Sequence, residues 1–190
     1  DFVATRPEGR LEFAHWADSK TRDYWFDLRG QIDPQVIRPL VPAPQQKAFE
    51  LFQFTEPPRI EGFVSGRYHA RERTTFRGHV TATNFVFRGE PVSFLEAQLQ
   101  YADQHFTATN ILLRSGSEWA QAPGVGFNLA SQTLFLTNIS AVMQPQRVAR
   151  AIGPKTAVLL SPYAFQQPIT ARADGSVNVR EQKRADLRFE

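Results

Sequence analysis

The fold is decided by the stretch from Thr74 to Leu113, TTFRGHVTATNFVFRGEPVSFLEAQLQYADQHFTATNILL. Apolar and polar residues alternate through three consecutive runs of this stretch, and short polar segments separate the runs. Alternation with a period of two is typical of strands that have one apolar face. The separating segments, RGEP at 88–91 and ADQH at 102–105, are short enough to join antiparallel neighbours. The stretch therefore predicts a meander of β-hairpins.

The same alternation continues on both sides of this stretch. It predicts strands around residues 11–15, 24–28, 60–68, 119–129 and 134–139, two late strands at 169–173 and 177–179, and a last one at 185–189. Phe85 and Phe87 fall on the opposite parity to Phe76 and Val80, which predicts a bulge or a strand buried on both faces.

Helical spacing interrupts the alternation twice. Asp33 and Pro34 form a helix start, followed by apolar residues up to position 41, and residues 45–54 are expected to form a second short amphipathic helix. The pattern returns at 144–161. The predicted fold class is therefore all-β, a long curled antiparallel meander sheet with two short amphipathic helical inserts near 33–54 and 144–161. The apolar face of such a sheet either closes into a filled sandwich or barrel or stays open as a groove.

Composition fits one globular or sheet-like chain and excludes several kinds of chemistry. The 190 residues are 42% hydrophobic and include 16 Phe and no Cys, which excludes disulfides, thiolate metal sites and cysteine nucleophiles. The four His have no ligand-type spacing, the carboxylates form no catalytic pair, and no apolar run approaches the length of a membrane span. The sequence predicts a non-enzymatic chain with no metal and no cofactor.

An internal repeat links the two helical inserts. Pro34 and Pro145 lie 111 positions apart, and further residues of like chemistry share this offset. These further pairs are Gln35 with Gln146, Ile37 with Val148, Val41 with Ile152, Phe52 with Tyr163, Phe54 with Phe165, and Pro57 with Pro168. Residues 1–190 are therefore expected to be a single repetitive β segment, about one and a half units, of a larger protein.

Several motifs carry a resemblance to a known family. They read GQIDPQVI at 30–37, FTEPP at 54–58, NFVFRG at 84–89, PQRVARAIGP at 145–154 and PYAF at 162–165. Together they resemble the AsmA-like proteins of Gram-negative envelopes. The resemblance implies a sheet folded like a taco shell around an apolar groove. It also implies a periplasmic segment of a parent anchored in the inner membrane, which carries phospholipid towards the outer membrane.

The groove is expected to bind phospholipid or another acyl-chain lipid through the apolar side chains that alternate along the strands and share one face of the sheet. The expected wall consists of Val80, Ala82, Leu95, Ala97, Leu99, Tyr101, Phe106, Ala108, Leu112, Phe127, Leu129, Leu134 and Leu136. The alternative is a closed β-sandwich that serves as a structural or interaction module and binds no lipid.

A basic cluster lies around the connection at 68–75. It consists of Arg67, Arg71, Arg73 and Arg77. Such a cluster either contacts lipid head groups or forms a solvated loop and a charged edge strand that resists aggregation. It is too dilute for nucleic acid, which we do not expect as a partner.

Overall fold

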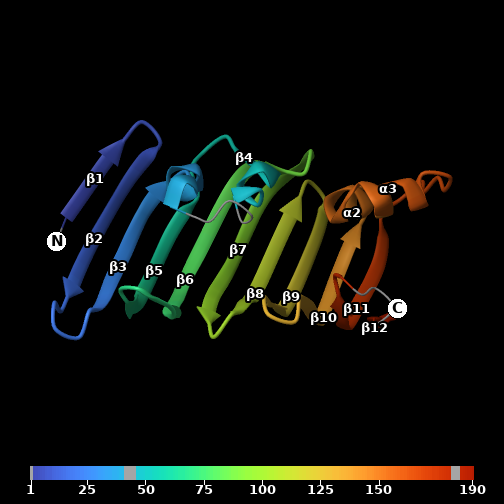
Figure 1. Ribbon diagram of the computed structural model, residues 1–190. Helices are drawn as coiled ribbons and strands as arrows, with labels where there is room; N and C mark the ends of the chain where they lie inside the picture. The colour runs from blue at the N-terminus through green and yellow to red at the C-terminus, as the bar shows by residue number, and fades with distance from the viewer. Residues whose placement is uncertain (1, 41–45, 181–184) are drawn as a thin grey trace.

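The structure is a computed structural model that describes residues 2–40, 46–180 and 185–190. Within this part of the chain, twelve strands form one antiparallel sheet, which Figure 1 shows as a single row. The strands are β1 (Phe2–Arg6), β2 (Gly9–Ala17), β3 (Asp23–Ile32), β4 (Phe52–Phe54), β5 (Arg59–Arg67), β6 (Ala70–Phe87), β7 (Glu90–Ala102), β8 (His105–Ser115), β9 (Glu118–Asn128), β10 (Thr133–Met143), β11 (Ile169–Asn178) and β12 (Ala185–Phe189).

Strand order follows the chain. Neighbours in the sheet are neighbours in sequence, except that β4 lies off the main path and pairs with β6. The sheet does not close, because β1 and β12 lie at its opposite ends (Figure 1). The all-β meander predicted from the sequence is confirmed. The closed sandwich is wrong for the described residues, since every strand belongs to the same sheet.

The predicted hairpin turns are tight. Arg88 and Gly89 have φ of 50° and 85°, and Asp103 and Gln104 have φ of 48° and 62°. Two consecutive residues with positive φ are typical of the turn whose twist matches that of the flanking strands. One expected break is absent: residues 169–173 and 177–178 belong to the continuous strand β11, which pairs with β10 and β12 on its two sides, and Val179 follows its last residue.

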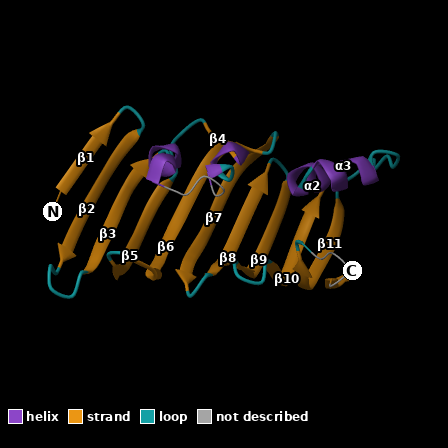
Figure 2. Cartoon of the chain, in the orientation of Figure 1, coloured by secondary structure: helices purple, strands orange, loops and turns teal. Residues whose placement is uncertain are grey.

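The helical inserts lie at one end of the strands, here called the insert end (Figure 2). The first contains two 3-10 helices, η1 (Pro34–Leu40) and η2 (Phe49–Leu51), and the second contains α2 (Pro145–Ile152) and α3 (Pro154–Leu160). Residues 41–45, where part of the first insert was expected, lie outside the described residues.

The second helix expected in the first insert is wrong for most of its length. After η2, Phe52–Phe54 extends as β4 and pairs with 85–87 at the end of β6. Strand β6 runs past the last residue that pairs with β5, so its edge is free to accept β4. The alternation of aromatic and polar residues at 52–54 suits a strand better than a helix.

An equivalent hydrogen bond occurs within each of the two inserts. The Gln35 side chain donates a hydrogen bond to the Phe49 carbonyl oxygen at 2.8 Å. The Gln146 side chain donates one to the Tyr163 carbonyl oxygen, also at 2.8 Å. In both cases the glutamine near the start of the insert is hydrogen-bonded to the backbone near its end. These two glutamines are the pair that the offset of 111 residues relates.

Three asparagines shift the apolar parity within their strands. Asn84, Asn110 and Asn138 lie inside β6, β8 and β10 with φ of 49°, 51° and 46°. Beyond Asn84 the apolar face continues through Phe85, which accounts for the parity change seen in the sequence. Left-handed residues inside a strand are typical of bulges, which bend the strand and raise its twist. The β7–β8 and β10–β11 pairings shift register beside Asn110 and Asn138, as at a bulge. The β6–β7 pairing keeps its register across Asn84, so the bulge predicted near Phe85 is not found there.

Replacing Asn110 tests this role. Asn110→Val is expected to lower the free energy of unfolding by about 1–2 kcal/mol, because a β-branched residue is strained at positive φ. Asn110→Gly is expected to be close to neutral, since glycine adopts this conformation freely. Chemical denaturation of the two variants measures the difference, and equal destabilisation by valine and glycine would contradict a conformational role.

The buried core is small and lies near the insert end. Ala82, Phe85 and Val92 form its centre, and β4 packs against them with Phe52 and Phe54. Among the described residues only six hydrophobic side chains are buried, and four of them are alanines. The sheet therefore leaves most of its large apolar side chains at least partly accessible.

Candidate functional site: the apolar sheet face

One face of the sheet collects the apolar residues of successive strands. Cross-strand partners share a face, so the pairs Val80 with Ala97 and Leu99 with Ala108 place their side chains together. The same rule carries the face from β8 through β9 to β10. The predicted residues on this apolar face are Val80, Ala82, Leu95, Ala97, Leu99, Tyr101, Phe106, Ala108, Phe127, Leu134 and Leu136.

Two residues of the expected wall lie elsewhere. Leu112 pairs with Glu96 and Gln121, so it lies on the opposite, polar face. The parity change at Asn110 causes this, and Leu113 takes the apolar position as the partner of Leu95. Leu129 follows the last residue of β9 and belongs to a turn, where its amide donates to the Gln104 carbonyl oxygen at 2.8 Å.

The apolar face also extends into strands that the sequence prediction left out of the wall. Phe13 pairs with Leu28 between β2 and β3, and Phe26 pairs with Val64 between β3 and β5. Phe2 stacks on Phe13 with ring centroids 5.4 Å apart. Alternation in residues 2–32 carries the signal for this extension, because it is the same period-two pattern as in the central stretch.

Cover over the apolar face is uneven. At the insert end β4 packs on it, and Ala82 and Ala97 are buried. Phe106, further along the same face, is 38% exposed. Within residues 2–40, 46–180 and 185–190, no second sheet lies over this face. The face is therefore an open apolar surface closed off only near one end of the strands.

The basic cluster does not join the apolar face. Arg67 pairs with Asp23 at 2.7 Å, and Arg77 lies over the Phe63 ring at 5.2 Å from its centroid, both on the polar face. The hydrogen bond from Arg67 lowers the pKa of Asp23, and the charge of Arg73 contributes in the same direction. The side chain of Arg71 lies outside the described residues. The charged-edge explanation is wrong, since β5 and β6 are internal strands.

A network of ion pairs fixes the second insert to the sheet. Arg147 of α2 contacts Glu90 at 3.0 Å and Glu118 at 2.9 Å, and it donates to Ser115 Oγ at 2.6 Å. Glu118 and Ser115 are buried, whereas Arg150 reaches Glu90 from the solvent side. Burial by itself would raise the pKa of Glu90, but the hydrogen bonds from Arg150 and Arg147 outweigh it and lower that pKa.

Arg88 connects the two inserts to each other. It occupies the turn between β6 and β7, and its backbone amide donates to the Leu51 carbonyl oxygen at 2.8 Å. Its guanidinium donates to the Ile152 carbonyl oxygen at the end of α2. Both inserts are thus held at the same end of the sheet, which leaves the middle and the far end of the apolar face uncovered by them.

None of the helices among the described residues is long and apolar enough to cross a membrane. Comparisons with protein-family models, with curated proteins and with solved structures found no match. Function is therefore argued from the open apolar face and its chemistry.

Proposed function

We propose that this chain is a non-enzymatic, periplasmic segment of an AsmA-like envelope protein, in which the open apolar face binds acyl chains of phospholipid. The parent protein would conduct the lipid between the inner and the outer membrane. The observation that carries the proposal is the single-layer sheet, whose apolar side chains have no covering layer in the described part of the chain.

The surface area supports an unfilled face. The chain exposes 12879 Å², whereas a compact monomer of its 21.6 kDa would expose about 9,200 Å². Soluble monomers rarely expose apolar patches of more than a few hundred Å², and larger ones are typical of binding surfaces. An occupant that is itself apolar would remove this surface from water.

Acyl chains fit the surface energetically. Burial of a methylene group is favourable by about 0.8 kcal/mol, so about a dozen methylenes give roughly 10 kcal/mol before ordering costs are subtracted. The alternating strands offer a run of aliphatic and aromatic side chains on that face, such as Leu99 beside Ala108 and Phe106 beside Phe127. This chemistry suits a hydrocarbon tail of variable length.

Leu99→Glu and Gln98→Glu test the proposal as a matched pair. The two residues are adjacent in β7 and add the same charge, but Leu99 lies on the apolar face and Gln98 on the polar face. Leu99→Glu is expected to reduce bound phospholipid at least about tenfold, because an unpaired carboxylate in an apolar site is strongly disfavoured. Gln98→Glu is expected to leave binding unchanged.

Native mass spectrometry measures the bound lipid after each protein is incubated with vesicles of phosphatidylethanolamine and phosphatidylglycerol. Circular dichroism checks that both variants keep the strand content of the wild type. Absence of bound phospholipid in the wild type would contradict the proposal and favour an interaction module without a lipid ligand. Equal loss in both variants would also contradict it.

A further inference from the structure

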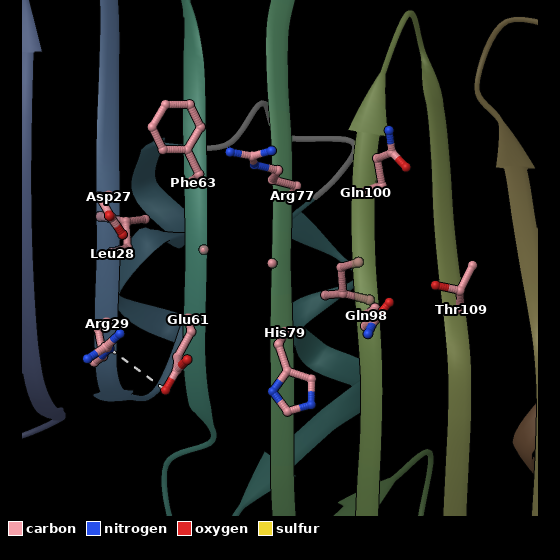
Figure 3. A pocket seen from close by; sticks show the side chains of 13 residues that line it. Asp27, Leu28, Arg29, Glu61, Phe63, Arg77, His79, Gln98, Gln100 and Thr109 are labelled. Carbon is pink, nitrogen blue, oxygen red and sulfur yellow. Dashed lines mark ion pairs between the residues drawn. The ribbon is translucent and has the colours of Figure 1, made fainter.

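The polar face carries a shallow trench at the centre of the sheet, on the side away from the apolar face. Two rows of cross-strand neighbours form its walls, and the trench has a volume of about 540 Å³. One wall consists of Arg29, Glu61, His79 and Gln98, and the other of Asp27, Phe63, Arg77 and Gln100. Figure 3 shows the two rows rising from neighbouring strands, with Thr109 at one end.

The trench runs across the strands. Its lining comes from β3, β5, β6, β7 and β8, which at about 4.8 Å between strands gives a length of about 19 Å. Gly62 and Gly78 pair with each other between the two walls and form part of its floor. A narrow, extended ligand lying across the strands suits this shape, whereas a compact cofactor would leave most of it empty.

The walls provide directional hydrogen-bonding groups. The side chains of Asp27, Gln98 and Gln100 are exposed and make no hydrogen bond to another described residue. Glu61 accepts a hydrogen bond from Arg59 at 2.9 Å, and His79 contacts Glu96 at the same distance, which fixes these two side chains in place. Carboxylates accept and amides both donate and accept, which matches a ligand rich in hydroxyl groups.

An aromatic platform lies in the same wall. Phe63 stacks on Trp25 with centroids 5.9 Å apart and an interplanar angle of 23°, and the Arg77 guanidinium lies over the Phe63 ring. Trp16, the cross-strand partner of Trp25, is 46% exposed on the same face. Aromatic rings beside planar polar groups give a ligand both an apolar contact and hydrogen bonds.

The charges of the trench exclude a strongly anionic ligand. Two guanidinium groups, of Arg29 and Arg77, are balanced by the carboxylates of Asp27 and Glu61. Single-stranded nucleic acid is bound by positively charged grooves, and this trench has no excess of positive charge. We propose that the polar trench binds a neutral oligosaccharide, with sugar hydroxyl groups bonded to Asp27, Gln98 and Gln100 and a sugar ring in contact with Phe63.

The test uses the full chain and defined probes. Isothermal titration calorimetry with cellohexaose, chitohexaose and maltohexaose is expected to show saturable binding of at least one hexasaccharide, and oligothymidylate is expected not to bind. Gln100→Ala is expected to weaken sugar binding about three- to tenfold through loss of a hydrogen bond. Phe63→Leu keeps an apolar side chain but removes the ring, and about a tenfold loss is expected.

Gln121→Ala is the matched control. Gln121 is also an exposed glutamine on the polar face, but it lies in β9 outside the trench. Its replacement is expected to leave sugar binding unchanged, and circular dichroism checks the fold of all three variants. The proposal is overturned if no hexasaccharide binds, if oligothymidylate binds more tightly than the sugars, or if Gln121→Ala weakens binding as much as Gln100→Ala. Lipid binding is independent of these outcomes, because the trench and the apolar face lie on opposite sides of the sheet.

Discussion

Phe85→Ala is expected to destabilise the sheet by about 3–5 kcal/mol, the range for removing a buried phenylalanine side chain. Phe85 is 3% exposed, and its ring centroid lies 5.5 Å from that of Phe54 and 6.3 Å from that of Phe52. It thus joins β4 to the sheet at the centre of the small core. Chemical denaturation followed by tryptophan fluorescence measures the loss of stability. Amide hydrogen exchange at 52–54 should show release of β4.

Phe135→Ala is the matched control for this prediction. Phe135 lies in β10 on the polar face and is 43% exposed, so its truncation removes little buried surface. The expected destabilisation is about 1 kcal/mol or less. If both substitutions lowered the free energy of unfolding equally, the core would not be concentrated where β4 meets β6.

Arg147→Met is expected to release the second insert from the sheet. The substitution keeps the aliphatic stem of the side chain but leaves the carboxylates of Glu90 and Glu118 without this cation. Breaking a buried ion pair by removing one partner is destabilising by about 3 kcal/mol or more, which corresponds to roughly a 100-fold loss of protection. Hydrogen exchange of the amides at 145–160 measures this loss, and global strand content should stay unchanged.

Arg38→Met serves as the control, because Arg38 forms an exposed ion pair with Glu50 in the first insert. Exposed pairs contribute about 0–1 kcal/mol, so exchange at 145–160 should not change.

Acid provides a second readout of the ion-pair network around Arg147. Glu90 has a pKa below its usual 4.5, so its contribution to docking is present above that pH and is lost as the pH falls through the lowered value. Unchanged protection from neutral pH down to well below 4.5 would contradict the role of this network.

The sequence by itself determined the local structure. Period-two alternation fixed the strands of the meander, and short polar segments such as 88–91 and 102–105 fixed the turns, because both depend on a few adjacent residues. The positions of the two inserts followed from proline and helical spacing in the same way. The parity change at Phe85 was visible in the sequence, and the positive φ of Asn84 accounts for it without a register shift between β6 and β7.

Only the tertiary structure decided how these elements meet. The bulge at Asn110 moved Leu112 to the polar face, and no local pattern distinguished Leu112 from Leu113 because both are leucine. Likewise, β4 became a strand because the end of β6 offered it a free edge, which is a contact between distant segments.

The two faces of the sheet were also assigned by long-range register. Pairing across four strands places Asp27, Phe63, Arg77 and Gln100 in one wall of the trench, although they are widely separated in the chain. Whether the apolar face is covered depends on every other element of the molecule. Alternation specifies that a face is apolar, but only the arrangement of the twelve strands in one open layer leaves that face accessible.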